Sequence, residues 1–120
     1  MKIQKNGFIA IPVTDMKRAR EFYEGVLGLK DSMSFLEVKW VEYNIGNDTV
    51  AISNVSDTWR PSDQGQRLAF EMENFDAAIA ELREANITFA REPFESPVCH
   101  MAIVQDPDGN KLIIHKLKSL

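Results

Sequence analysis

The chain has 120 residues, of which 44% are apolar and 27% are charged. Its formal net charge is -4, and no basic patch offsets the acidic excess, which argues against nucleic acid as a partner. The single cysteine, Cys99, excludes an intramolecular disulfide. No apolar stretch has the length of a membrane span or of a signal peptide's apolar region, so we expect a cytoplasmic protein without membrane contact.

The first half of the chain predicts a strand, a helix and further strands. Residues 8–13 form a short apolar strand. After it, apolar residues recur every three or four positions, which predicts a helix with Asp15 as its N-cap and Gly28 just after its end. Residues 32–46 hold one strand or two, and residues 47–55 indicate a turn followed by a strand.

The same pattern then occurs a second time. Residues 67–86, RLAFEMENFDAAIAELREAN, align without a gap with residues 8–27, FIAIPVTDMKRAREFYEGVL. Asn74 takes the place of Asp15 as a helix N-cap, and Asn86 suits the end of the second helix. A repeat of this length predicts two copies of one structural unit.

The remaining segments complete the second copy. Residues 56–66 form a polar linker between the halves, and residues 87–94 predict a strand that ends near Pro93. Residues 98–118 contain two apolar runs around DPDG, which predicts a hairpin with a tight turn. The organisation is therefore strand, helix, strands, twice.

Alternation with a period of two assigns the side chains of the first strand of each copy to faces. We expect one face to pack under the helix, with Ile9, Ile11 and Val13 in the first copy and Leu68, Phe70 and Met72 in the second. The opposite faces then carry Phe8, Ala10 and Pro12, and Arg67, Ala69 and Glu71. Charged side chains on such a face need partners or water, which predicts a polar pocket.

This organisation resembles the vicinal oxygen chelate superfamily, which includes glyoxalase I, bleomycin-resistance proteins and extradiol dioxygenases. The resemblance is carried by two motifs, IPVTDMKRAREFYEGVLGLK in the first half and IVQDPDGNKLIIH in the second. The resemblance covers essentially the whole chain. It implies an α+β fold in which two βαβββ modules, residues 1–57 and 64–120, form a cupped mixed sheet in a single glyoxalase-like domain over residues 1–120. It also implies a homodimer.

Family enzymes carry metal ligands, usually His, Glu or Gln, at equivalent points of the two modules. Carried over to this chain, these positions hold Phe8, Ala51, Arg67 and Ile114. Phe, Ala and Ile have no donor atom, and an arginine stays cationic and repels a divalent ion. We therefore expect no metal and no other cofactor, and we assign Phe8, Ala51 and Ile114 to the lining of a ligand cleft.

Arg67 is the leading candidate for ligand binding. Its guanidinium group could hold a carboxylate, a phosphate or a phenolate through paired N–H donors. The alternative is an internal ion pair with Glu71 or Glu42, and the two interpretations are compatible because a ligand could displace the partner.

Trp40 and Glu42 share one face of a predicted strand in VKWVEYNIG. If that face is concave, Trp40 provides a stacking surface and Glu42 an acceptor or a base. The alternative places both in solvent or at a dimer contact. Glu42 and Glu71 are the candidate catalytic bases.

His100 and His115 are the only histidines. A four-residue loop at DPDG would place them opposite each other across the hairpin, where two imidazoles could bind a metal or move protons. A surface or interface pair is the more common arrangement. For Cys99 we expect a buried, inert thiol.

Two functions with a ligand remain from these residues, and a purely structural or regulatory dimer is a third class. The first is a metal-independent small-molecule binding protein of the bleomycin-resistance type, with an anionic or aromatic ligand in a concave cleft. The alternative is a lyase or another enzyme of the superfamily. Such an enzyme would be metal-free, with Glu42 or Glu71 as the base, or would use non-standard metal ligands such as His100 and His115.

Overall fold

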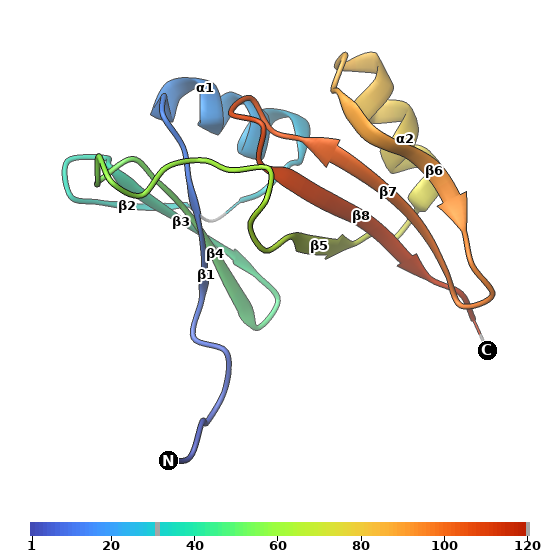
Figure 1. The fold of residues 1–120 in the computed structure, drawn as a ribbon, viewed down its shortest axis with the longest axis horizontal. Coiled ribbons are helices and arrows are strands. Elements are labelled where there is room, and N and C mark those ends of the chain that lie inside the picture. The colour runs from blue at the N-terminus through green and yellow to red at the C-terminus, as the bar shows by residue number, and fades with distance from the viewer. Residues whose placement is uncertain (31, 120) are drawn as a thin grey trace. The chain divides into compact units, whose positions relative to one another are not determined.

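A computed structural model describes residues 1–30 and 32–119. The chain forms two compact units, Met1–Pro61 and Ser62–Leu120, each with one four-stranded sheet and one helical segment (Figure 1). The assignment of residues 1–120 to one domain stays a prediction. Within the described part of the chain, no helix is both long enough and apolar enough to cross a membrane.

The first unit follows the predicted order of a strand, a helix and three strands. Its elements are β1 (Ile9–Pro12), α1 (Met16–Arg20), η1 (Glu21–Val26), β2 (Met33–Phe35), β3 (Trp40–Ile45) and β4 (Asp48–Ser53). The sheet order is β1-β4-β3-β2, with β1 parallel to β4 and the other pairs antiparallel. The helix widens in η1, where the N–H of Leu27 donates to the carbonyl of Phe22, five residues back.

The second unit repeats this topology. Its elements are β5 (Leu68–Glu71), α2 (Phe75–Glu84), β6 (Phe89–Glu95), β7 (Cys99–Gln105) and β8 (Lys111–Leu117). The sheet order is β5-β8-β7-β6, again with one parallel pair, β5 and β8, and two antiparallel pairs. Two mixed four-stranded sheets, each with its helical segment, confirm the predicted α+β class and the two βαβββ modules.

The predicted helix caps are confirmed. The Asp15 side chain accepts a hydrogen bond from the N–H of Arg18 at 3.0 Å, and the Asn74 side chain accepts one from the N–H of Ala77 at 3.0 Å. Gly28 and Asn86 both have positive φ, +74° and +57°, as expected for the residue that ends a helix in the left-handed region.

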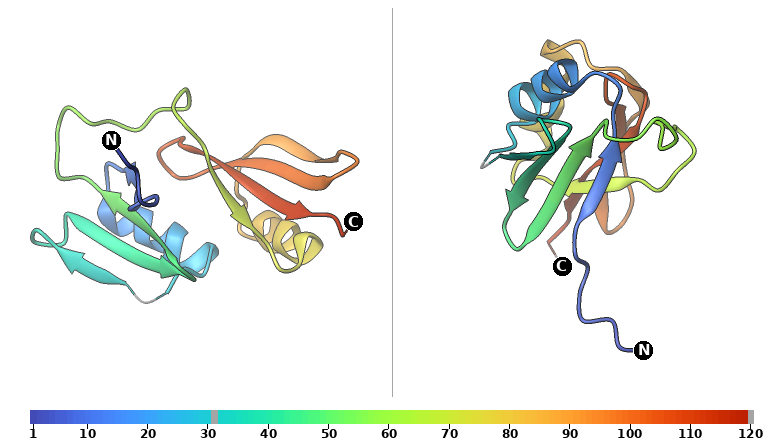
Figure 2. Two further views of the ribbon diagram at one scale, coloured as in Figure 1. Left: turned by 90° about the horizontal axis from the view of Figure 1, so that it is seen from below. Right: turned by 90° about the vertical axis from the view of Figure 1, so that its left-hand side faces the viewer.

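Each sheet has one face against its helix and one face away from it (Figure 2). The side chains toward the helix are almost completely buried: Val41, Tyr43, Val50 and Ile52 in the first unit, and Ala102, Val104, Leu112 and Ile114 in the second. Because neighbouring residues of a strand point to opposite faces, Trp40, Glu42, Ala51 and Ser53 lie on the other face of the first sheet. The predicted alternation is therefore confirmed.

A polar contact ties the first helix to its sheet. The hydroxyl of Tyr43, which is fully buried, donates to the Glu24 carboxylate at 2.6 Å, and Arg20 donates to the same oxygen at 2.6 Å. Burial and the Glu24 carboxylate raise the pKa of Tyr43 well above its usual range, so the phenol stays a donor. Burial acts to raise the pKa of Glu24, but hydrogen bonds from Arg20 and Tyr43 outweigh it and lower that pKa.

The hairpin of the second unit differs from its predicted register by one residue. Gln105 pairs with Lys111, so the connection has five residues, and Met101, not His100, lies opposite His115. The reason is the Asp106 carboxylate, which accepts from the backbone N–H groups of Asp108 and Asn110, both at 2.9 Å. These bonds draw Asn110 into the turn. His100 and His115 therefore lie on opposite faces, and the predicted pair is wrong.

The strand predicted to end near Pro93 continues through it to Glu95. Its pairing with β7 shifts between Arg91 and Phe94, on either side of the proline. β6 is the edge strand of its sheet, where a residue without an N–H is tolerated because no neighbour needs that donor.

We expect Tyr43→Phe to lower the free energy of unfolding by about 1–2 kcal/mol, because it removes a hydrogen bond to a charged group. Urea denaturation measures the difference. Thr58→Val is the control, because the Thr58 side chain is exposed and its hydroxyl contacts only the exposed Ser56 hydroxyl at 3.0 Å. Equal changes in the two variants would contradict a structural role for the Tyr43 hydroxyl.

The Glu24 carboxylate should contribute a pH-dependent stability. Its pKa in the folded chain lies below the ordinary value of 4.5, so the contribution is complete above that pH and is lost as the pH falls through the folded pKa. We therefore expect the difference in unfolding free energy between the native chain and Glu24→Gln to be constant near neutral pH and to shrink in acid. A difference that grows on acidification would contradict this assignment.

Candidate functional site

Each sheet has a face that points away from its helix, which we call its open face. Three aromatic side chains gather on the open face of the first sheet. The rings of Phe8 and Trp40 meet edge to face with centroids 5.7 Å apart, and Trp59 lies at 6.4 Å from Trp40 at an angle of 34°. Phe8 precedes β1, Trp40 begins β3, and Trp59 belongs to the linker. Trp59 was missed by sequence reasoning, because its surroundings indicated only a polar linker. We call Phe8, Trp40 and Trp59 the aromatic cluster.

Glu42 lies beside this cluster. The indole N–H of Trp40 donates to the Glu42 carboxylate at 2.8 Å, and both residues are half-buried. Ala51 pairs with Ala10 on one side and with Glu42 on the other, and it is fully buried. The structure thus places Trp40, Glu42, Ala51 and Phe8 in one unit, with the indole ring held in orientation by a charged acceptor.

A cavity of about 400 Å³ adjoins Trp59. Its polar lining includes the cations Lys39 and Arg60, the anion Asp57, and Asn54. The side-chain oxygen of Asn54 is buried and has no hydrogen-bond partner within residues 1–30 and 32–119. A buried acceptor without a donor is unfavourable, so an N–H or O–H group of a ligand would be stabilising there.

The open face of the second sheet carries a carboxylate–imidazole pair. Glu71 ends β5 directly beside His115 of β8, and its carboxylate contacts Nδ1 of that histidine. The other carboxylate oxygen accepts from the backbone N–H of Leu117 at 2.7 Å. The Leu117 N–H and His115 together lower the pKa of Glu71.

Arg67 is exposed just before β5 and makes no ion pair with any residue that the structure describes. The suggested internal ion pair with Glu71 does not form, because residues four apart on a strand are about 13 Å apart along the chain. Glu71 is held by His115 instead. Binding of a ligand by Arg67 stays a prediction.

The metal-ligand position that the sequence assigned to Ile114 is occupied by the preceding residue, Ile113. Ile114 is fully buried and pairs with Phe70 and Ala102 on the face under α2. Ala51 pairs with Ala10, and the corresponding pair in the second unit is Ala69 with Ile113. Ile113 is therefore the structural equivalent of Ala51, and Ile114 lies in the core rather than in the lining of a cleft.

The residues at the metal-ligand positions do not fit a metal ion. Phe8, Ala51 and Ile113 offer only carbon atoms, and Arg67 offers a cation. Among residues 1–30 and 32–119, no three His, Cys, Asp or Glu side chains lie close enough together to hold a metal ion. The alternative metal site cannot form from His100 and His115 together, because the two residues lie on opposite faces of the sheet.

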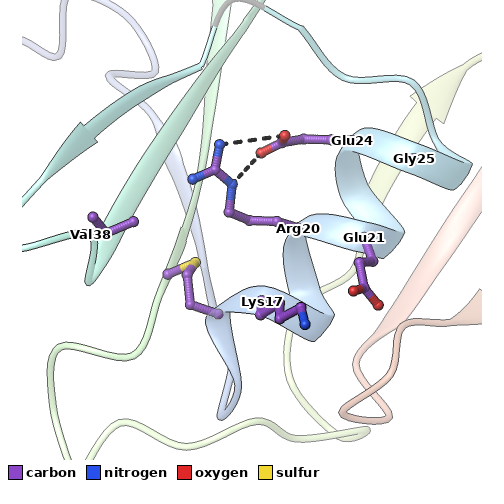
Figure 3. A pocket seen from close by; sticks show the side chains of 7 residues that line it. Lys17, Arg20, Glu21, Glu24, Gly25 and Val38 are labelled. Atoms are coloured by element: carbon purple, nitrogen blue, oxygen red, sulfur yellow. Dashed lines mark hydrogen bonds and ion pairs between the residues drawn. The ribbon is translucent and has the colours of Figure 1, made fainter.

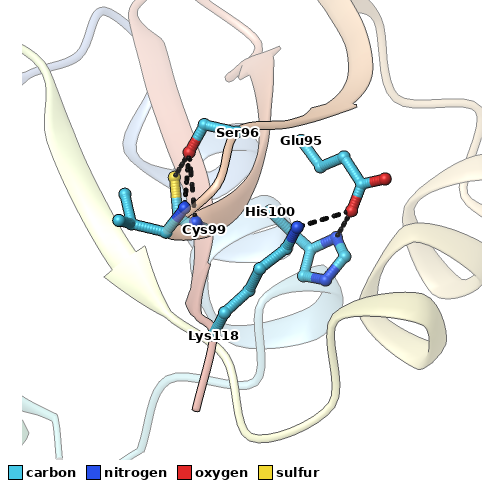
Figure 4. A network of polar contacts seen from close by, with 6 residues as sticks. Glu95, Ser96, Cys99, His100 and Lys118 are labelled. Carbon is cyan, nitrogen blue, oxygen red and sulfur yellow. Dashed lines mark hydrogen bonds and ion pairs between the residues drawn. The ribbon is translucent and has the colours of Figure 1, made fainter. Parts of the chain in front are cut away.

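His100 belongs to a surface network on the helix side of the second unit. Its ring stacks on Phe75 with centroids 5.5 Å apart, and its Nδ1 lies 3.8 Å from the Glu95 carboxylate. Lys118 reaches the same carboxylate at 2.8 Å and lowers the pKa of Glu95 (Figure 4). The nearby Cys99 is buried, as predicted, and its Sγ lies 3.4 Å from the Ser96 hydroxyl.

A larger open groove of about 750 Å³ lies beside α1 and η1. Arg20 and Glu24 point toward each other in it and are already paired, and Val38 faces them from the loop after β2 (Figure 3). That loop is strained, because Leu36, Glu37 and Val38 all have positive φ, between 53° and 64°. Sequence reasoning gave no sign of this turn, and the groove contains none of the predicted site residues.

The contact between the two tryptophans is testable by circular dichroism. Trp40 and Trp59 are the only tryptophans, and two indoles this close should couple their electronic transitions. We expect a far-ultraviolet exciton couplet in the native chain that disappears in both Trp40→Phe and Trp59→Phe. Tryptophans that are not in contact would instead contribute independent signals. In that case the signal lost in Trp40→Phe and the signal lost in Trp59→Phe would sum to the tryptophan signal of the native chain.

Comparisons with known proteins agree with this architecture. A crystal structure of an antibiotic binding protein from Streptomyces is 22% identical, with a TM-score of 0.79 over 98% of this chain and 99% of that one. A glyoxalase/dioxygenase from Nostoc punctiforme is 21% identical, with a TM-score of 0.81 over 97% of this chain and 92% of that one. No curated protein matches the sequence significantly. The family model of the glyoxalase/bleomycin resistance protein/dioxygenase superfamily matches residues 6–114, and the chain belongs to this superfamily.

Proposed function

We propose that this protein binds an aromatic small molecule without a metal ion. The observation that carries the proposal is the aromatic cluster on the open face of the first sheet, with Trp40 oriented by Glu42. Clustered aromatic rings next to a few polar groups are the usual composition of a small-molecule site. A planar ligand would stack on the indoles and exclude water from them.

The polar cavity beside Trp59 supports a second feature of the ligand. Lys39 and Arg60 would attract an anionic group, and the free oxygen of Asn54 would accept a hydrogen bond. We therefore propose a ligand with an aromatic part and an anionic part. Binding of an anion by Arg67, in the second unit, is a separate proposal, and it is supported by a guanidinium that is exposed and makes no ion pair among the described residues.

Metal independence is supported by the chemistry of Phe8, Ala51, Ile113 and Arg67, the residues at the family's ligand positions. Binding without catalysis is compatible with the superfamily, since one of its structural neighbours is described as an antibiotic binding protein. That likeness shows the fold, and the identity of a ligand for this chain rests on its own side chains. The homodimer implied by the resemblance stays a prediction.

Tryptophan fluorescence tests the proposal, because both tryptophans lie in the aromatic cluster. We expect naphthoate to quench the fluorescence saturably, neutral naphthamide to bind more weakly, and cyclohexanecarboxylate not to bind. Trp40→Leu, read through Trp59, should weaken naphthoate binding about tenfold, because loss of one stacked ring removes about 1–1.5 kcal/mol. Lys39→Ala with Arg60→Ala should remove the preference for the anion.

The matched control is Phe89→Leu. Phe89 is an aromatic residue of the second unit that pairs with Val104 on the helix side and lies under the Arg83 guanidinium at 4.5 Å. This variant should bind naphthoate like the native chain. Quenching that rises linearly without saturation, or that is the same for naphthoate and cyclohexanecarboxylate, would argue against an aromatic site here.

A further inference from the structure

The pair of Glu71 and His115 has the geometry of a proton-transfer site. Parallel pairing of β5 with β8 places the two residues side by side, and the Met72 N–H donates to the His115 carbonyl at 2.8 Å, which extends this pairing beyond β5. The position of the imidazole is thus set by a regular sheet rather than by a loop. Sites on strands hold their side chains more accurately than sites on loops.

Two donors hold the Glu71 carboxylate. One oxygen contacts His115 Nδ1, and the other accepts from the Leu117 N–H at 2.7 Å. These donors lower the pKa of Glu71, so the group is an acceptor at neutral pH. An ionised carboxylate at Nδ1 favours the tautomer with the proton on that nitrogen, which leaves the lone pair on Nε2.

The second ring nitrogen is available to a ligand. The His115 side chain is 24% exposed, and Nε2 has no hydrogen-bond partner among the described residues. Across the sheet, His115 pairs with Met101, which in turn pairs with Phe94. Cross-strand partners share a face, so Met101 and Phe94 lie in line with the imidazole. The Arg91 guanidinium lies over the Phe94 ring at 3.7 Å, so a ligand on this face would meet the Met101 side chain and a cation.

We propose that His115 is a general base, oriented by Glu71, which makes this face a catalytic site for proton transfer. In ester hydrolysis, Nε2 would take a proton from water as the water oxygen forms its bond to the carbonyl carbon. The bond to the leaving oxygen then breaks, and Nε2 returns the proton to the products, so that acid and alcohol are released and the histidine is regenerated. His115 is the catalytic residue, and Glu71 is a positioning residue. The proposal does not rest on the aromatic cluster.

Hydrolysis of para-nitrophenyl acetate tests the catalytic residue. We expect the native chain to hydrolyse this neutral ester well above the rate of free imidazole at equal concentration. His115→Gln should reduce the excess about a hundredfold, the usual contribution of a general base. His100→Gln is the matched control and should retain the native rate, because its ring lies on the opposite face. Thermal melts of both variants check their folding.

The tautomer of His115 tests the positioning residue. Long-range proton–nitrogen NMR spectra should show the Nδ1–H tautomer in the native chain and a mixture of tautomers in Glu71→Gln. The same variant should lose roughly tenfold or more of the hydrolysis rate, because an imidazole in the wrong tautomer cannot act as a base. A merely structural Glu71 would change stability without changing the tautomer.

Three results would overturn the proposal. They are hydrolysis no faster than with free imidazole, a native rate in a folded His115→Gln variant, and a mixed tautomer in the native chain. None of them depends on tryptophan fluorescence. Failure of this site is therefore distinguishable from failure of the proposed ligand binding.

Discussion

The parallel pairing of the first strand with the last strand in each unit is the constraint on which the rest of the structure depends. β1 pairs with β4, and β5 pairs with β8, in matching register. This pairing decides which side chains lie under the helix and which lie on the open face. A shift by one residue would exchange the two faces completely. The aromatic cluster, the Glu71–His115 pair and the buried core all follow from this register.

The larger features of the fold could be predicted because they arise from local physical rules. Asp15 and Asn74 cap helices with their side-chain oxygens, and the change from a period of two to a period near four marks the end of a strand. Because the two halves repeat one pattern, the strands and helix predicted in one half support those predicted in the other. These signals need no knowledge of distant contacts.

The errors arose where a side chain makes a contact that periodicity does not encode. Asp106 binds two N–H groups in the turn, and this lengthened the hairpin loop by one residue and separated His100 from His115. The assignment of Ile114 failed by one residue for a related reason, because only the pairing of β5 with β8 shows which residue matches Ala51. Trp59 was missed because its partner, Trp40, is distant in the sequence.

We propose that groups other than metal ligands provide the binding chemistry on the faces of the two sheets that point away from the helices. Carbon side chains and a guanidinium stand at the ligand positions, while indole rings in one unit and a carboxylate–imidazole pair in the other supply stacking and basicity. In the function proposed here, such a scaffold would bind ligands through rings and hydrogen bonds, without the Lewis acid that polarises substrate oxygens in metal enzymes.

The most direct test of this account is the metal content of the purified protein. Elemental mass spectrometry after equilibration with zinc, nickel, manganese and iron, and removal of the free ions, should find far less than one metal ion per chain. Ligand binding by such metal-free protein would then be as tight as before the treatment. One tightly held ion per chain would contradict the account and would show that side chains outside the positions of Phe8, Ala51, Arg67 and Ile113 form a metal site.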